Sequence, residues 1–295
     1  MEILLALGGL ALCAAIWGIA IERHLYSIRR ETIAVLPAGS PDIRVLHIGD
    51  IHMAPWQKRK QRFVRSLGDL KPDLVVNTGD NLGHLKAIAP VLSALKPLLE
   101  VPGVFVNGSN DYYAPVLRNP LGYLAKPSDR SEGPALDTAR LVGSFQAAGW
   151  KNLNNHEGAL TINGVKLGFL GVDDAHDELD DLASLDDQRK KVADAQLLIG
   201  VSHAPYMRVI ESMANQDVRL LFAGHTHGGQ VCIPGYGALV TNCDLPARDA
   251  KGLSAWTFNG KSLILNVVAG LGHSIFAPVR FACRPEVRLL TLVAA

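Results

Sequence analysis

IRVLHIGDIH, residues 43–52, decides the fold of this chain. It begins as a short apolar run with the Val, Ile and Leu bias of a strand buried on both faces. Gly49 then permits a tight turn, and Asp50 and His52 follow directly. The stretch therefore predicts a buried strand that delivers a carboxylate and an imidazole to one edge of a sheet.

The same succession of apolar run and polar cluster recurs along the chain. The further examples are DLVVNT (73–78) before Gly79-Asp80-Asn81, GVFVN (103–107) before Gly108-Ser109-Asn110-Asp111, LLIGV (197–201) before Ser202-His203, and RLLFA (219–223) before Gly224-His225-Thr226-His227. Ligands of such sheets bind beyond the carboxyl ends of the strands. We therefore expect all of these polar clusters at one site.

Helices and hairpins are predicted between and after these runs. In residues 57–70 a helical period places Phe63 and Val64 on one face and Lys58, Arg59 and Lys60 on the other. Asn-Gly pairs at 163–164 and 259–260 lie between apolar runs and are the strongest short hairpin signal. A last strand is expected in VRLLTLVA (287–294). The fold class is therefore α/β, with mixed sheets and helices outside.

Composition favours one globular domain with no general affinity for polyanions. The chain has 295 residues, of which 48% are hydrophobic and 6% aromatic, as an aliphatic α/β interior requires. Lys and Arg number 29 against 28 Asp and Glu, a formal charge of +1, so nucleic acid is not expected as a partner. The four cysteines form no CxxC pair and are interpreted as ordinary buried thiols.

An apolar segment near the N-terminus predicts a membrane anchor. Ile3–Ile21 carries no charge, and as a helix it would extend about 28 Å, close to the ~30 Å hydrocarbon core of a bilayer. A cleaved signal peptide is the main alternative, but only Met1 and Glu2 precede the run, without the positive charge of such peptides. Apolar residues all round the helix argue against a buried soluble helix. We expect an uncleaved, single-pass anchor.

The residues after the apolar run predict orientation and domain limits. Arg23, His24, Arg29 and Arg30 follow it, and the positive-inside tendency then places the folded domain in the cytoplasm. We assign residues 1–30 to the anchor, and 31–42, which contain the Pro-, Gly- and Ser-bearing LPAGSPD (36–42), to a linker. Residues 43–295 are assigned to the folded domain.

The polar clusters supply the ligands of a metal site. They contain carboxylates and imidazoles but no thiolate, which suits divalent Mn, Fe, Zn or Co rather than a purely structural zinc. The candidate ligands are Asp50, His52, Asp80, His203, His225 and His227. Two such ions ~3.5–4 Å apart could each bind a phosphate oxygen and activate a bridging hydroxide, a chemistry that fits phosphoester hydrolysis.

The order of these motifs resembles the calcineurin-like metallophosphoesterases from about Arg44 to Leu292. LHIGDIHMAP (46–55), GVDDAHDELDDL (171–182), GHTHGGQVCIPGYGALVTN (224–242) and RPEVRLLTL (284–292) are similar to a membrane-associated branch of bacterial phosphodiesterases and UDP-2,3-diacylglucosamine pyrophosphatase-like proteins. The resemblance implies a four-layer αββα sandwich of two mixed sheets flanked by helices. It also implies that Asp50, His52, Asp80 and His227 hold one metal. Asp80, an Asn-type ligand, His203 and His225 would hold the other, with Asp80 bridging and with Asp80, Asn110 and His203 in catalytic positions.

The chain departs from the family pattern at Gly108-Ser109-Asn110-Asp111. An ungapped match places Ser109 where the family has a metal-binding Asn and Asn110 where it has a proton-donating His. A small backbone shift would instead let Asn110 bind the metal, which we prefer because an amide oxygen is the better ligand. Asn cannot act as a general acid, so a good leaving group is expected. The sequence thus favours diester or pyrophosphate bonds over alkyl monoesters.

Other histidines and one long loop are weaker candidates. His47 is interpreted as a packing residue or a residue behind the ligands rather than as a ligand, because it points to the opposite face from Ile48 and away from the turn. His84 and His176 either support the site or lie in solvated loops. Residues 112–134, with Arg118, Lys126 and Arg130, are either a surface loop or a lid over the metals.

The expected function is a membrane-anchored phosphodiesterase or pyrophosphatase. Its substrate would be a small-molecule or lipid-linked phosphoester, and residues 3–21 would contact the membrane. The alternatives are a phosphoprotein phosphatase and a catalytically silent metal or phosphate binder.

Overall fold

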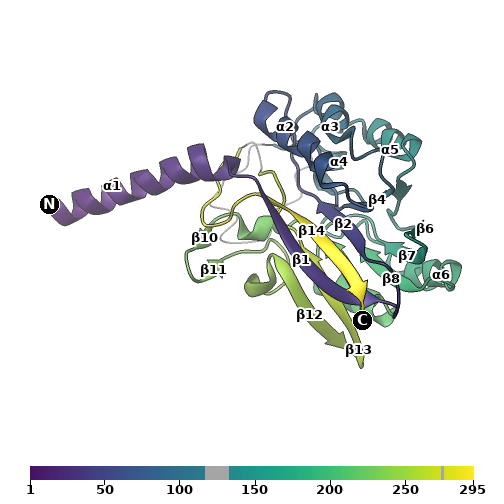
Figure 1. Ribbon diagram of the computed structural model, residues 1–295. Coiled ribbons are helices and arrows are strands. Elements are labelled where there is room, and N and C mark those ends of the chain that lie inside the picture. The colour runs from purple at the N-terminus through teal and green to yellow at the C-terminus, as the bar shows by residue number, and fades with distance from the viewer. Residues whose placement is uncertain (117–132, 274–275) are drawn as a thin grey trace.

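Strand β2 (Ile43–Ile48) is a buried strand, as its sequence predicts, and lies inside a six-stranded sheet. In the computed structural model, which describes residues 1–116, 133–273 and 276–295, its neighbours are β3 (Leu74–Asn77), parallel to it, and β14 (Glu286–Ala294), antiparallel to it (Figure 1). Beyond these lie β4 (Gly103–Phe105) and β5 (Lys151–Asn152) on one side and β1 (Ser27–Leu36) on the other. This first sheet is therefore mixed.

A second six-stranded sheet carries the remaining polar clusters. Its order is β12 (Gly252–Phe258), β13 (Lys261–Val267), β9 (Leu220–Ala223), β8 (Leu197–Val201), β7 (Val165–Gly171) and β6 (Glu157–Ile162). The two Asn-Gly pairs form the β6–β7 and β12–β13 turns, and all four of these turn residues have positive φ, as two-residue hairpins require. A separate two-stranded ribbon pairs β10 (Cys232–Ile233) with β11 (Gly237–Ala238).

The sheets face each other across an apolar core, and helices cover their outer faces. Val45, Val76, Phe169 and Phe222 are fully buried in the core between the sheets, and each such side chain contributes ~1.5–3 kcal/mol of burial. The first sheet is covered by α2 (Lys58–Ser66), α3 (Ile88–Leu95) and α5 (Thr138–Ala147), and the second by α6 (Leu185–Lys191) and α7 (Met207–Asn215). The four-layer αββα architecture is confirmed.

Short helical turns complete the described part of the chain. They are η1 (Trp17–Ile21), η2 (Glu22–His24), η3 (Leu67–Leu70), α4 (Ser109–Tyr112), η5 (Leu182–Ser184), η6 (His227–Gly229) and η7 (Ala247–Asp249). The helical period predicted for residues 57–70 is confirmed by α2 and η3, except that Lys60 is buried rather than exposed with Lys58 and Arg59.

The stretch assigned to a linker begins inside a strand. Ser27–Leu36 forms β1, which pairs in parallel with β14 from Ser27 opposite Glu286 to Leu36 opposite Ala294. Ile33 and Leu36 are buried in the core between the sheets. Residues 31–36 are therefore part of the sheet, and only the short segment from 37 to 42 connects β1 to β2.

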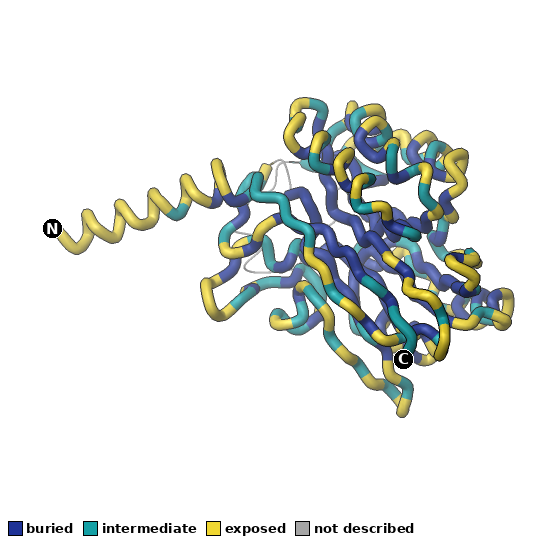
Figure 2. Tube along the Cα trace, in the orientation of Figure 1, coloured by how far each residue is buried: buried dark blue, intermediate teal, exposed yellow. Residues whose placement is uncertain are grey.

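The apolar N-terminal segment forms helix α1 (Glu2–Ile16) and projects from the domain (Figures 1 and 2). With η1 and η2 it makes a 23-residue helical stretch, Glu2–His24, with a mean hydropathy of 2.3. Among the described residues this is the one stretch long and apolar enough to cross a membrane. It is a candidate membrane span by length and composition.

Candidate metal centre

The candidate ligands lie in turns with an unusual backbone conformation. Asp50, His52, Asp80, His225 and His227 all have φ between 41° and 67°. This left-handed region is uncommon for residues other than glycine, and its strain persists where the surrounding structure fixes it. The backbone conformation of the turns after β2, β3 and β9 therefore directs these side chains into the site.

Close approach of the backbone brings the turns together. A Cβ atom on Gly108 would overlap the Asp80 carboxylate and the His203 ring, and one on Gly224 would overlap the Asp50 carboxylate. Only glycine lets the chain pass this close to the side chains of the site. The glycines ahead of the polar clusters thus have a direct role in compacting the site.

Asp50 is fully buried within the site. Both of its carboxylate oxygens accept hydrogen bonds from the His225 backbone N–H, at 3.0 Å. Its Oδ1 is 3.8 Å from His227 Nε2. Burial raises the pKa of Asp50 to about 7, and the nearby Asp80 carboxylate adds to the effect. A cation beside Asp50 would favour its charged form.

Asp80 lies between the two groups of imidazoles. Its Oδ2 is 3.3 Å from His52 Nε2 and 3.7 Å from His203 Nε2. Asn110 donates to Asp80 twice at 2.8 Å, from its backbone N–H to Oδ1 and from Nδ2 to Oδ2. Although burial opposes ionisation, the two imidazoles and the Asn110 donors leave the pKa of Asp80 below its usual value. Asp80 is therefore placed to be shared between two cations.

Two pairs of imidazole nitrogens face each other across the site. His203 Nε2 is 3.3 Å from His225 Nδ1, and His52 Nε2 is 3.2 Å from His227 Nε2. His203 Nδ1 donates to the Thr78 carbonyl at 2.7 Å, so its Nε2 atom faces the site. Although burial opposes the charged form, the Asp80, Asp174 and Asp50 carboxylates raise the pKa of His203 to about 9. Facing lone pairs repel unless a proton or a cation lies between them, so this arrangement fits a bound metal.

The atoms cluster in two overlapping groups of metal-binding type. One group is Asp50, His52 and His227, and the other is Asp50, Asp80 and His203, each with its ligand atoms within 4.8 Å of one another. Asp50 belongs to both groups, whereas the family resemblance makes Asp80 the bridging residue. The Asp80 carboxylate contacts one imidazole of each group, His52 and His203, which is the position that a bridge requires.

Asn110, rather than Ser109, approaches the Asp and His cluster. It holds Asp80 through the two hydrogen bonds above, while no hydrogen bond joins the Ser109 hydroxyl to a described residue. The Asn110 side chain also carries a carbonyl oxygen that can bind a metal. Asp111, fully buried beside it, accepts from the Asn81 backbone N–H at 2.8 Å and so fixes the turn after β3.

The weaker histidine candidates fall in different places. His47 is buried between Thr78 Oγ1 (3.2 Å) and Asn266 Nδ2 (2.7 Å), in agreement with a packing role. The His176 ring packs against His225 at a tilt, with ring centroids 4.4 Å apart and an interplanar angle of 41°, so it contacts a candidate ligand. His84 packs against exposed Trp56.

The loop proposed as a lid lies mostly in residues 117–132, outside the described residues, together with Arg118, Lys126 and Arg130.

Two buried cations that the sequence patterns do not reveal hold the ligand turns. Arg280 donates to the His227 carbonyl (3.1 Å) and, through Nη2, to the carbonyls of Gly272 (2.6 Å) and Ala269 (2.7 Å). Lys60 donates to the carbonyls of Ile51 (2.7 Å) and His52 (3.3 Å). Burial lowers the pKa of Lys60 to about 7. Since both bind backbone carbonyls, no side-chain motif marks them in the sequence.

Taken with its relatives, this site defines a metal-dependent phosphoester hydrolase. The model of the calcineurin-like phosphoesterase family matches residues 43–229, and the chain belongs to that family.

Three relatives span nearly the whole chain. A metallophosphoesterase of Aquifex aeolicus is 28% identical over 92% of this chain and 94% of its own length. The Bacillus subtilis metallophosphoesterase YkuE is 24% identical over 92% of this chain and 87% of its own length. The UDP-2,3-diacylglucosamine pyrophosphatase LpxG of Chlamydia trachomatis is 27% identical over 84% of this chain and 83% of its own length.

Proposed function

We propose that this protein is a membrane-anchored phosphodiesterase or pyrophosphatase with a two-metal centre. One ion would bind Asp50, His52, Asp80 and His227, and the other Asp80, Asn110, His203 and His225. The observation that carries the proposal is the presence of two pairs of facing imidazoles, with Asp80 in contact with one imidazole of each pair. Imidazole, carboxylate and amide ligands without thiolate suit Mn, Fe, Zn or Co.

The residues around the ligands keep the site in one arrangement. Two bound divalent ions would supply Lewis acidity toward phosphate oxygens and lower the pKa of water. The Thr78 carbonyl orients His203, and the Asn242 carbonyl, 3.1 Å from His225 Nε2, orients His225. Such bonds behind a ligand fix which ring nitrogen faces the site. Arg280 and Lys60 donate to the backbone carbonyls of His227 and His52 and so hold the turns that carry these two residues.

The third polar cluster favours substrates with good leaving groups. Asn110 occupies the position next to Asp80, and an amide cannot give a proton to a departing alkoxide. A pyrophosphate or aryl phosphate leaves without such help. Diester and pyrophosphate bonds are therefore the proposed targets, ahead of alkyl monoesters.

A substrate in or at the membrane is the second part of the proposal. The candidate span Glu2–His24 would hold the domain at a bilayer surface, and the basic residues after it favour the cytoplasmic side. LpxG, a relative over most of the chain, is named for a diphosphate substrate that carries two acyl groups. A lipid-linked phosphoester agrees with both observations.

The test is hydrolysis of bis-p-nitrophenyl phosphate by the full chain with added Mn²⁺. Asp80→Asn should lower kcat by on the order of a thousand-fold, since a bound ion contributes several kcal/mol to the transition state. Asp69→Asn, at an exposed position on the same sheet–helix unit, is the matched control and should retain full activity. Turnover that survives Asp80→Asn would contradict the two-metal centre. Absence of metal-dependent turnover in the parent would favour a silent binder.

A further inference from the structure

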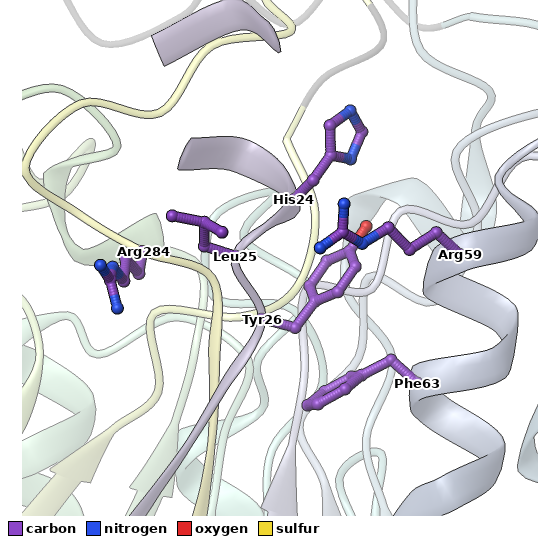
Figure 3. A pocket seen from close by; sticks show the side chains of 6 residues that line it. All are labelled: His24, Leu25, Tyr26, Arg59, Phe63 and Arg284. Atoms are coloured by element: carbon purple, nitrogen blue, oxygen red, sulfur yellow. The ribbon is translucent and has the colours of Figure 1, made fainter. Parts of the chain in front are cut away.

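A pocket of about 290 Å³ lies at the base of the N-terminal helix, apart from the metal ligands. It is lined by His24, Leu25, Tyr26, Arg59, Phe63 and Arg284 (Figure 3). His24 is the last residue of the helical stretch Glu2–His24, Leu25 and Tyr26 follow it, and Arg59 and Phe63 come from α2. Its volume is at the lower end of that of small-ligand sites.

The charges at this pocket are positive and unpaired. Arg59 and Arg284 are exposed, and neither has an ion pair or a hydrogen bond with any described residue. The lining contains no acidic residue. His24 Nδ1 is buried and also has no hydrogen-bond partner in the described part of the chain. Unpaired guanidinium groups favour an anion with several oxygens, because the planar fork binds two oxygens at once.

The α2 helix adds to this positive field. Lys58 and Arg59 lie exposed in its first turn, and no acidic residue lies there. A helix N-terminus already carries a partial positive charge and stabilises anions rather than cations. An anion in the pocket would relieve this unfavourable arrangement.

The floor of the pocket is aromatic and supplies a neutral donor. Tyr26 and Phe63 stack with ring centroids 5.1 Å apart and an interplanar angle of 26°. Burial raises the pKa of Tyr26 to about 12, so its hydroxyl stays protonated at neutral pH. An amphipathic ring of this kind is typical of the membrane–water interface. The pocket thus offers both charge and a surface for the apolar part of a ligand.

We propose that this pocket binds the phosphate of an anionic membrane lipid beside the N-terminal helix. This inference rests on the proposed membrane span and not on hydrolysis. If the span crosses the bilayer, its end at His24 places the pocket at the level of the lipid headgroups. Ile19 and Ile21, both more than two-fifths exposed just before the pocket, lie where acyl chains would pack. Soluble anions lack that apolar contact.

The experiment measures equilibrium binding of a fluorescent phosphatidylglycerol to the full chain in uncharged detergent, with a chelator present to prevent turnover. Phosphatidylglycerol should bind more tightly than phosphatidylcholine. Arg59→Gln and Arg284→Gln should each weaken binding about five-fold, the effect of one basic residue near an anionic surface. Arg59→Lys keeps the charge but not the planar fork, so it should weaken binding less than Arg59→Gln does. Arg62→Gln, an exposed position on the same helix, is the matched control and should change binding less than two-fold.

Three results would overturn the proposal. Equal affinity for phosphatidylglycerol and phosphatidylcholine would exclude recognition of the anion. An equal loss of phosphatidylglycerol affinity in Arg62→Gln would mean that general surface charge, and not the pocket, causes the binding. Competition by inorganic phosphate at the concentration at which the lipid binds would show a site for soluble anions. Because no hydrolysis is measured, each of these results leaves the phosphoesterase proposal standing.

Discussion

Asn110 is the residue at which this chain departs most clearly from its family pattern. It contacts both oxygens of Asp80, so it is well placed to bind a metal but cannot donate a proton to a leaving group. On the proposed function, the two adjacent residues Ser109 and Asn110 would control which bonds the site can cut. Their effect can be tested by restoring the family residues.

The double substitution Ser109→Asn, Asn110→His should confer hydrolysis of alkyl monoesters. General acid catalysis contributes 10²–10⁴-fold, so we expect kcat with glycerol phosphate to rise by on the order of a hundred-fold. The aryl diester has a good leaving group and should change little. The comparison is kcat for the two substrates, with Ser109→Asn alone as the control. A parallel change for both substrates would show that leaving-group protonation is not the cause.

Asp174 gives the metal-free protein a predictable pH dependence. It is fully buried, its Oδ1 accepts from the His176 backbone N–H, and its Oδ2 has no partner among the described residues. Burial raises the pKa of Asp174 to about 7, above its unfolded value of about 4. The folded state therefore holds the proton more tightly, and the stability that this contributes is present below pH ~4 and lost as pH rises to about 7.

Asp174→Asn should remove this loss of folding stability at rising pH. Relative to the parent, the variant should become more stable as pH rises, by a few kcal/mol at most at pH 7, and the difference should shrink toward pH 4. Thermal unfolding with chelator at pH 4, 5.5 and 7 measures it, and Asp69→Asn serves as the control. A difference that does not vary with pH would mean that Asp174 does not titrate in this range.

The sequence predicted the Asp and His positions of the site but not the residues behind them. Asp50, Asp80 and His203 could be found because each directly follows a buried strand, and strand ends meet at one edge. The helical period predicts Lys60 on a polar helix face, yet in the structure its buried amino group donates to two backbone carbonyls. Arg280 has no pattern around it, since its partners are backbone atoms of distant turns. Such bonds exist only once the chain is folded.

At the level of elements, the buried strands were predictable and the edge strand was not. β2, β8 and β9 are short, mostly apolar runs rich in Val, Ile and Leu, because nearly all of their residues are buried. β1 has the sequence SIRRETIAVL, whose alternation is broken by Arg29, Arg30 and Glu31. Its partner β14 comes more than two hundred residues later, from Ser27 opposite Glu286. Local sequence carries no signal for such a pairing.

Truncation tests whether β1 belongs to the folded unit. A chain that begins at Leu25 lacks the candidate span but keeps β1, and it should fold as a soluble domain. A chain that begins at Ile43 loses Ile33 and Leu36 from the core, at ~1.5–3 kcal/mol each, and exposes the edge of β14, which favours aggregation. We expect a melting temperature lower by at least about 5 °C and aggregates in size-exclusion chromatography. Equal melting temperatures for the two truncated chains would mean that the folded domain begins at residue 43.

At the scale of the whole molecule, the proposed metal ligands come from both sheets. Asp50, His52, Asp80 and Asn110 follow strands of the first sheet, and His203, His225 and His227 follow strands of the second. An ion bound between them would connect the two sheets through contacts that apolar packing alone does not make. Without cations, burial with like charges keeps the pKa of Asp50 near 7, and the imidazole nitrogens face one another. The centre should therefore stabilise the fold as well as catalyse.

Removal of the metals should lower the melting temperature of the whole domain in one transition. Ligands that bind only the folded state at a thousand times their Kd add ~4 kcal/mol, which for a domain of this size corresponds to about 10 °C. Chelation should produce this decrease and added Mn²⁺ should reverse it. In Asp80→Asn the same cycle of chelator and Mn²⁺ should move the melting temperature by less than half as much, because the shared carboxylate is gone. If the variant responded as strongly as the parent, the stabilising ion would have to lie elsewhere, and the two sheets would not be joined through Asp80.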